Sequence, residues 1–233
     1  DRSIPYGINN LGKVVGQSYF DNVYSHAMFW DKVKKIDLGT LNGKYSSAYA
    51  INNAGKVVGY SEVGTTTSTQ SIIHAVIWDK GKKIDLGTLG GMNSYAYDIN
   101  NAGKVVGESI AGSYYRATLW YKGNKINLGA LPGSFSHSYA RAINNAGKVA
   151  GYSTSSGLSF KHAVLWDKGS IIDLGTLGGS ESEAYDINNA DQVVGKSITS
   201  SGVYHAVLWD KGEKIDLGTL GGKESGSCVI TFC

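Results

Sequence analysis

The sequence has very little proline and cysteine. Only 2 of its 233 residues are proline and 2 are cysteine, whereas 32 are glycine and 15 are tyrosine. Both cysteines, Cys228 and Cys233, stand among the last six residues, so no disulfide framework holds the rest of the chain together. A local disulfide and two free thiols are both compatible with this placement, and the spacing fits no zinc motif.

Long apolar runs and helical periodicity are also missing. No apolar run approaches the length of a membrane span, and no stretch has the spacing of an amphipathic helix. The net charge of +3 comes with lysines spread along the chain, which argues against a nucleic-acid interface, since that needs a clustered basic stripe. No catalytic triad, phosphate-binding loop or dinucleotide fingerprint is present, so we expect no cofactor. The chain starts at Asp1 without an apolar leader, and we expect a processed product or a fragment.

What the sequence does contain is repetition. One phrase, cleanest at residues 205–222, occurs five times, starting at His26, His74, Arg116, His162 and His205. A second phrase, Ile-Asn-Asn-Ala-Gly-Lys-Val-Val-Gly at its cleanest, starts at Ile8, Ile51, Ile99, Ile143 and Ile187. The tryptophans of the first phrase recur after 48, 42, 46 and 43 residues. A period near 45 residues is typical of β-propeller blades.

Each repeat contains four short strand candidates, for example residues 46–52, 56–61, 74–78 and 83–89. Five such meanders cannot bury their own faces and must stack, so we predict an all-β, five-bladed β-propeller over residues 1–222. A straight β-solenoid is the alternative, but it usually lacks such antiparallel hairpin turns. The predicted blades span approximately residues 3–41, 46–89, 94–131, 138–177 and 182–220.

The two ends of the chain compete for one position in this fold. Residues 3–9 and residues 225–231 both resemble a first strand, which gives six candidates for five blades. We favour residues 3–9 as the innermost strand of the first blade. Residues 223–233 are then a tail beside the closure, a closing strand, or an extension that serves self-association.

The turns carry conformational predictions. Gly55 and Gly81 each end a tight turn, as expected where a type I turn is followed by a left-handed residue. Asp191 replaces this glycine in the fifth repeat and tolerates positive φ. Val33 replaces it in the first repeat and does not, so we predict a rearranged turn at residues 31–34.

A histidine and an aspartate recur together in four repeats. His26, His74, His162 and His205 are followed by Asp37, Asp85, Asp173 and Asp216, whereas the third repeat has Arg116 and Asn127. A ring of metal ligands is one interpretation. Structural hydrogen bonding is the one we prefer, because third strands lie far apart in a propeller while a zinc ion needs ligands at about 2 Å. No metal site is therefore expected.

Function is expected where the repeats differ from one another. Asp98 and Asp186 stand just before the isoleucine of the first strand, where they could hold a cation, form an acid/base pair or simply line a wet channel. Beside these positions and in the variable loops stand the other candidate ligand-binding residues: Tyr49, Tyr97, Tyr185, Arg141, Tyr114 and Tyr115. Aromatic rings with polar neighbours suit sugar rings, and they suit a protein surface as well. The long phrase itself breaks at Val33, Arg116, Tyr121 and Asn127, where we also expect function.

The combined motif resembles a known family. His-Ala-x-x-Trp-Asp-x-Gly, then Ile-Asp-Leu-Gly-Thr-Leu-Gly-Gly, Ser-x-Ala-x-x-Ile-Asn and Val-Val-Gly, over residues 3–222, is similar to the HAF repeat of bacterial extracellular proteins. The phenylalanine of the family name is Met28, Val76, Thr118, Val164 and Val207 here. The resemblance implies secretion and a propeller-like repeat, and it implies no established activity.

Three hypotheses of function follow. The first is a secreted, non-enzymatic binding module that recognises carbohydrate or a glycoconjugate through its loop face. The second is a structural or assembly protein of an extracellular surface, using residues 223–233 for contact with the next copy. The third is a glycosidase-like enzyme built on Asp98 and Asp186. The partners expected are accordingly glycans or a protein surface, with no nucleic acid and no membrane span.

Overall fold

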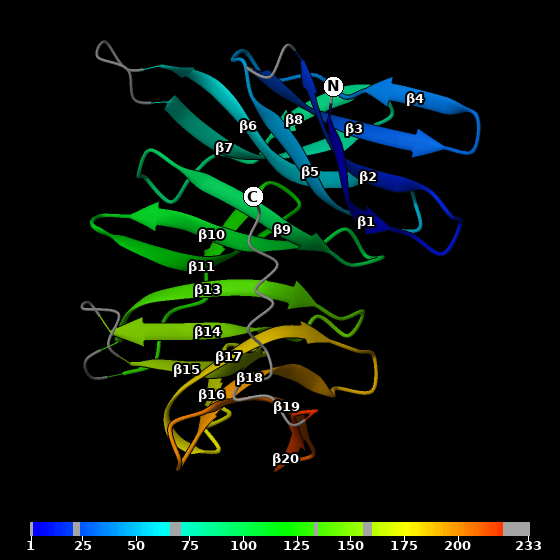
Figure 1. The fold of residues 1–233 in the computed structure, drawn as a ribbon. Coiled ribbons are helices and arrows are strands. Elements are labelled where there is room, and N and C mark those ends of the chain that lie inside the picture. Colours follow the sequence, from blue (N-terminus) through cyan, green and yellow to red (C-terminus); the bar gives the residue numbers. More distant parts are fainter. Residues whose placement is uncertain (1, 21–23, 66–70, 133–134, 156–159, 221–233) are drawn as a thin grey trace. The chain divides into compact units, whose positions relative to one another are not determined.

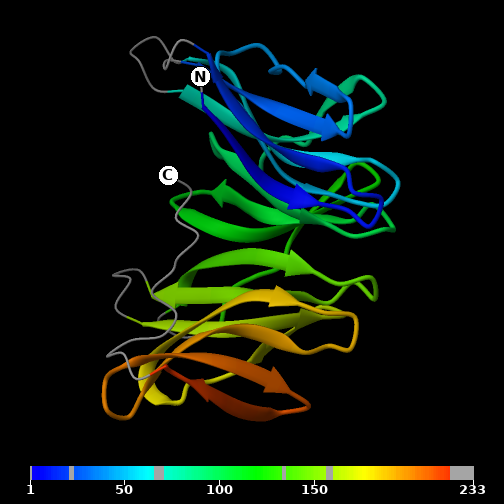
Figure 2. The same cartoon turned by 45° about the vertical axis from the view of Figure 1, so that its right-hand side comes forward.

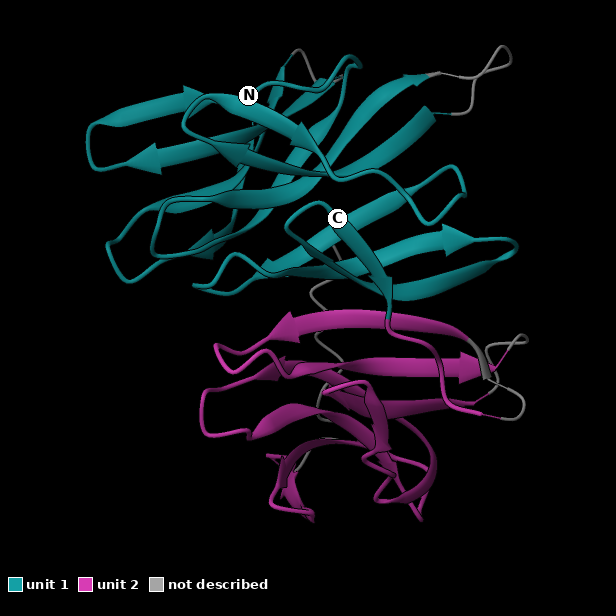
Figure 3. Ribbon diagram, turned by 180° about the vertical axis from the view of Figure 1, so that it is seen from behind, with its two compact units in different colours: residues 1–127 teal, residues 128–233 magenta. Residues whose placement is uncertain are grey.

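The computed structural model describes residues 2–20, 24–65, 71–132, 135–155 and 160–220 (Figure 1). Over these ranges the chain forms twenty strands and no helix, so no segment there could cross a membrane as a helix. The chain divides into two compact units, residues 1–127 and residues 128–233 (Figure 3). A single domain over residues 1–222 stays a prediction.

The strands fall into five repeats of four. In the first unit they are β1 (Ser3–Ile8), β2 (Val14–Phe20), β3 (Tyr24–Asp31), β4 (Lys34–Asp37), β5 (Ser46–Ile51), β6 (Val57–Thr65), β7 (Ser71–Asp79), β8 (Lys82–Asp85), β9 (Ser94–Ile99), β10 (Val105–Ala111), β11 (Tyr114–Tyr121) and β12 (Asn124–Asn127). In the second unit they are β13 (Phe135–Ile143), β14 (Val149–Ser155), β15 (Lys161–Asp167), β16 (Ser170–Asp173), β17 (Gly178–Ile187), β18 (Val193–Thr199), β19 (Tyr204–Asp210) and β20 (Glu213–Gly218).

Every repeat is an antiparallel meander. The sheet orders β1-β2-β3-β4, β5-β6-β7-β8 and β9-β10-β11-β12 follow the chain, and β13 to β16 and β17 to β20 pair in the same way. One parallel pair, Lys161 with Glu181, joins the last two repeats into a larger sheet. The predicted four-stranded repeat is therefore confirmed, whereas closure of five blades into a ring stays a prediction.

One of the two predicted turn types is wrong. Between β5 and β6 only Gly55 has positive φ, 82°, as predicted. Between β7 and β8, however, both Lys80 and Gly81 have positive φ, 51° and 80°. This is a two-residue type I′ turn, which matches the right-handed twist of the flanking strands better than type I.

The two exceptional turns behave as expected. Asp191 adopts positive φ of 65° in place of the usual glycine. The turn between β3 and β4 keeps two residues, Lys32 and Val33, between the paired Asp31 and Lys34, but neither of them has positive φ. The predicted rearrangement at residues 31–34 is confirmed, because the β-branched valine resists the left-handed conformation.

The glycine that closes each Val-Val-Gly motif is required by a bulge in the first strand. The register of β5 against β6 slips between Ala48 and Ala50. The slip brings the carbonyl oxygen of Ser47 so close to Gly59 that a Cβ there would overlap it. The same overlap would occur in the other repeats, at Gly16, Gly107, Gly151 and Gly195.

Consecutive repeats within a unit are joined by apolar and polar contacts. Val15 and Ala27 of the first repeat pack against Ile51, Val57 and Trp78 of the second, and equivalent clusters join repeats two and three and repeats four and five. In the first unit the strands β1, β5 and β9 are neighbours in space (Figure 2). The small residues of the repeat thus let adjacent sheets approach closely.

An asparagine ladder runs along the turns that follow the first strands. The Asn9 side-chain amide donates to the Asn52 carbonyl at 3.0 Å, and Asn52 donates to the Asn100 carbonyl at 3.1 Å. In the second unit Asn144 donates to the Asn188 carbonyl at 3.2 Å. The carboxamide oxygen of Asn52 also accepts from its own turn, at Lys56 N. The turn asparagines therefore cap their own backbone and also tie neighbouring repeats within a unit to one another.

Candidate functional site

Two ends of each sheet have different roles. The turns between strands one and two and between strands three and four lie at one end, which we call the turn end. The variable hairpins between strands two and three, together with the connections to the next repeat, lie at the other end, which we call the loop end. The binding residues predicted from the sequence lie either in the first strands or at the loop end.

One cross-strand pair varies in every repeat. It joins the residue before the first-strand alanine to the residue after the second-strand glycine, and we call this set the variable layer. Its pairs are Ile4–Gln17, Ser47–Tyr60, Tyr95–Glu108, Tyr139–Tyr152 and Glu183–Lys196. A constant glycine flanks it on the loop-distal side, paired with alanine in four repeats and with Pro5 in the first. The scaffold therefore holds five different side-chain pairs in one geometry.

In the first unit the variable layer meets a cluster of tyrosines. Tyr49 packs against Tyr6 at 5.5 Å between ring centroids, against Tyr60 at 5.6 Å, and in a stacked geometry against Tyr97 at 5.7 Å. Tyr60 in turn packs edge-on against Tyr95 at 5.5 Å. The structure thus brings together Tyr49 and Tyr97, two of the predicted site residues, and adds Tyr60 and Tyr95.

Burial keeps these phenols protonated. It raises the pKa of Tyr60 and of Tyr95 to about 12, with neighbouring tyrosines adding to the effect. The pKa of Tyr49 is raised further, again mainly by burial and then by Tyr60 and Tyr6. At neutral pH the cluster therefore offers hydroxyl groups that can donate or accept hydrogen bonds.

The two predicted loop tyrosines differ in exposure. Tyr114 is 41% exposed and carries the Arg116 guanidinium over its ring at 5.1 Å. Tyr115 turns inward, and burial followed by the charge of Glu108 raises its pKa. Tyr115 is therefore a neighbour of Glu108 in the variable layer, whereas Tyr114 lies on the surface of the loop end.

In the second unit a charged network occupies the corresponding place. Glu183 is 8% exposed. It pairs with Lys161 at 2.9 Å and with Lys196 at 3.7 Å, and it accepts a hydrogen bond from the Tyr185 hydroxyl at 3.3 Å. Burial and the neighbouring Glu183 raise the pKa of Tyr185. Burial lowers the pKa of Lys161, but the hydrogen bond from its ammonium to Glu183 and the charge of that carboxylate outweigh burial and raise it.

Arg141 lies beside two stacked rings of the fourth repeat. Its guanidinium donates to the Tyr152 hydroxyl at 2.9 Å and lies 5.3 Å from that ring and 5.7 Å from the Tyr139 ring. Tyr139 and Tyr152 stack at 4.8 Å. The predicted site residues Arg141 and Tyr185 are therefore each part of a polar aromatic cluster within the second unit.

The two nominated carboxylates make the same local contact. Asp98 accepts from the Ile99 backbone N–H at 2.7 Å, and Asp186 accepts from the Ile187 N–H at 2.8 Å. Asp98 belongs to the first unit and Asp186 to the second. An acid/base or cation-binding pair of the two stays a prediction.

The repeated histidines and aspartates form hydrogen-bonded pairs within each repeat. His74 Nδ1 lies 2.8 Å from Asp85, and the same aspartate accepts from the Gly87 N–H at 2.7 Å. The equivalent pairs are His26–Asp37, His162–Asp173 and His205–Asp216. This confirms the predicted structural hydrogen bonding. Among the described residues no three His, Cys, Asp or Glu side chains gather closely enough to hold a metal ion.

Several members of these clusters were not singled out as binding residues from the sequence, notably Glu108, Tyr95, Glu183, Lys161 and Lys196. The sequence feature that could have identified them is variation between repeats: the residues at these positions differ from repeat to repeat, whereas their neighbours along the strand recur. Which of them face one another depends on the register and on the first-strand bulge. Cys228, Cys233 and the tail from 223 to 233 lie outside the described residues.

Comparison with solved structures shows the fold. The chain is similar to the β-propeller domain of the trilobed protease from Pyrococcus furiosus, with a TM-score of 0.63 at 14% identity, over 90% of this chain and 64% of that one. It therefore spans slightly less than two thirds of that domain. It is also similar to a putative TolB from Agrobacterium tumefaciens, with a TM-score of 0.60 at 12% identity, over 93% and 80% of the two chains.

A weaker likeness is to the Aleuria aurantia lectin, with a TM-score of 0.46 at 11% identity, over 93% of this chain and 77% of the lectin. That score is too low to support an inference about function. No protein-family model matches the sequence, and no curated protein sequence matches it. The repeats thus have the β-propeller fold, while membership of the HAF-repeat family stays a prediction.

Proposed function

We propose that the protein is a non-enzymatic, extracellular binding module that recognises carbohydrate at the loop end of its repeats. The observation that carries the proposal is the recurrence of exposed aromatic rings there. Phe20, Tyr24, Tyr114 and Phe160 are 41%, 37%, 41% and 53% exposed. They come from the hairpins between strands two and three of three different repeats. Such rings offer flat apolar faces to the C–H faces of sugars.

Polar groups stand beside two of these rings. Lys44 lies over the Tyr24 ring at 5.3 Å, and Arg116 lies over the Tyr114 ring at 5.1 Å. An ammonium or guanidinium group next to an aromatic face can donate hydrogen bonds to the hydroxyl rim of a sugar stacked on that face. The same combination in separate repeats favours several similar sites over one deep pocket.

A glycan array probed with the full chain tests the proposal, followed by titration calorimetry with the best glycan. We expect Tyr114→Ala and Phe160→Ala each to weaken binding about tenfold, because each removes a stacking face. Leu11→Ala is the matched control, since Leu11 is 63% exposed but lies at the turn end. Failure of every glycan at millimolar concentration, or equal binding by the three variants, would refute carbohydrate recognition and leave a protein surface as the partner.

A further inference from the structure

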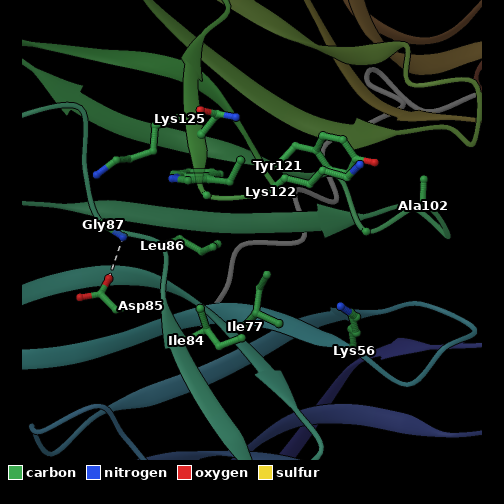
Figure 4. A pocket seen from close by; sticks show the side chains of 14 residues that line it. Lys56, Ile77, Ile84, Asp85, Leu86, Gly87, Ala102, Tyr121, Lys122 and Lys125 are labelled. Atoms are coloured by element: carbon green, nitrogen blue, oxygen red, sulfur yellow. Dashed lines mark hydrogen bonds between the residues drawn. The ribbon is translucent and has the colours of Figure 1, made fainter.

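A groove opens between the second and third repeats, at the turn end of the first unit. It has a volume of about 590 Å³ and lies between the sheet β5–β8 and the sheet β9–β12 (Figure 4). Its walls come from the strands β7, β8, β11 and β12 and from the turns beside them. The groove is therefore separate from the loop end proposed above for carbohydrate.

The inner part of the groove is apolar and contains one unsatisfied donor. Ile77, Ile84, Leu86 and Trp120 supply the apolar surface. Trp120 is only 2% exposed, and its indole Nε1 has no hydrogen-bond partner among the residues that the structure describes. A buried N–H group without an acceptor is destabilising, because it loses its hydrogen bond to water. An acceptor atom brought by a ligand would remove that destabilisation.

The rim of the groove is predominantly positive. Lys56, Lys122 and Lys125 line it, and Lys125 Nζ packs beside Gly87. The one carboxylate in the lining, Asp85, already accepts from His74 and from the Gly87 N–H. Figure 4 shows Lys125 and Lys122 approaching from the third repeat and Asp85 and Lys56 from the second. The rim therefore favours an anionic group.

Tyr121 gives this groove a feature that the other repeats lack. Asp31, Asp79, Asp167 and Asp210 occupy its position elsewhere, and two of these aspartates pair with a lysine of their own repeat, Lys56–Asp79 at 3.2 Å and Lys148–Asp167 at 3.5 Å. In the third repeat Lys104 and Lys122 instead lie 5.8 and 5.2 Å from the Tyr121 ring. The exchange replaces an acid by an aromatic face at the edge of the groove.

From these observations we infer that the groove between the second and third repeats binds a small amphipathic organic anion, a flat apolar body carrying one carboxylate or sulfonate group. The apolar body packs against Ile77, Ile84 and Tyr121, and the anionic group lies among the rim lysines. A second acceptor on the ligand, or one oxygen of the anionic group, satisfies the Trp120 indole.

The junction between the fourth and fifth repeats provides an internal control. Its lysine at the position of Lys125 is Lys214, which packs beside Gly175 in the same way. Acids surround it at the corresponding places, however: Asp210 replaces Tyr121, Asp191 replaces Gly103 and Glu213 replaces Asn124. The same scaffold thus presents an acidic rim there, and we expect no anion to bind.

Titration calorimetry of the full chain with 1-naphthoate tests the inference, with the neutral 1-naphthylmethanol as the comparison ligand. We expect naphthoate to bind more tightly than the alcohol. Tyr121→Asp should weaken naphthoate binding about tenfold and Lys125→Gln about fivefold, while Lys214→Gln leaves it unchanged. Trp120→Phe should weaken it about fivefold, and Trp166→Phe, which removes an equivalent buried indole N–H, should not.

The surface variants keep the test informative even if Trp120→Phe unfolds the chain, because Tyr121 and Lys125 lie at the rim. Three results would overturn the inference: no naphthoate binding at millimolar concentration, equal affinity for the acid and the alcohol, or equal effects of Lys125→Gln and Lys214→Gln. Glycan binding at the loop end should be unaffected by Tyr121→Asp, so the two proposals fail or succeed separately.

Discussion

Tyrosine rings pack against one another around the variable layer of the first unit, in which Glu108 is a charged member, whereas the second unit carries an ion-paired cluster at Glu183 and Lys196. Tyr49, Tyr60, Tyr95 and Tyr97 pack ring against ring in one, whereas Glu183 pairs with Lys161 and Lys196 in the other. The flanking glycines and the first-strand bulge are the same in both. The difference shows that this scaffold fixes where the side chains stand without fixing their chemistry, as expected where different sites can be built on one fold.

The largest expected effect comes from the second-strand glycine, which the two units share. Gly107→Ala in the first unit and Gly195→Ala in the second should each lower the free energy of unfolding by about 3 kcal/mol or more, because the added Cβ overlaps the carbonyl oxygen of Tyr95 or Glu183. Urea unfolding measures this. Gly55→Asn, in open space at positive φ, is the control and should cost well under about 1 kcal/mol. A tolerated alanine in either unit would show that the two layers are not built alike.

The next effect concerns only the ion pairs that Glu183 forms in the second unit. Glu183→Ala should destabilise the protein by about 2 kcal/mol, because it leaves Lys161 and Lys196 largely buried without their shared carboxylate. Tyr95→Phe, at the equivalent position of the third repeat, should cost about 1 kcal/mol or less. Thermal and urea unfolding of both variants decide between these values. Equal costs would mean that Glu183 acts as packing rather than as a counter-ion.

The smallest effect belongs to the tyrosine cluster of the first unit and depends on pH. In the unfolded chain Tyr60 and Tyr95 ionise near pH 10, whereas in the folded chain the pKa of each is raised to about 12, mainly by burial. Their stabilisation is therefore complete below pH 10 and is lost as the pH rises through 12. We expect a loss of about 1 kcal/mol per residue at pH 11.

The tyrosine contribution is isolated by comparing wild type with Tyr60→Phe in urea at pH 8 and pH 11. The variant should lose less stability between the two values, since phenylalanine cannot ionise. Absorbance at 295 nm reports phenolate formation in the same samples. An identical pH response of the two proteins would place the alkaline sensitivity outside this cluster.

The repeat pattern was enough to predict the strands and most of the turns. Glycine at position 55 and valine at position 33 specify backbone conformations by sterics alone, and both predictions hold. Lys80 was misjudged because a lysine before glycine carries little signal for positive φ, whereas the strand twist demands it. A turn type can therefore be predicted from the local sequence only where a residue excludes one of the alternative backbone conformations.

The candidate site was less predictable for a different reason. Tyr49 and Tyr97 were predicted because they stand beside positions at which the repeats differ. Glu183 and Lys161, in contrast, are 22 residues apart and come from different repeats. Their meeting depends on how far one repeat is displaced against the next, which the bulge and the asparagine ladder set. No pattern within a single repeat contains that information.

The asparagine ladder also gives the molecule a polarity. The three amides of the ladder each donate toward the C-terminal neighbour: Asn9 to Asn52, Asn52 to Asn100 and Asn144 to Asn188. Donor and acceptor are thus matched only when one complete repeat follows another in the same sense. Duplication or deletion of a whole repeat preserves each hydrogen bond of the ladder. Insertion of part of a repeat leaves a side-chain amide without its carbonyl acceptor. We therefore expect proteins of this architecture to differ in length by whole repeats.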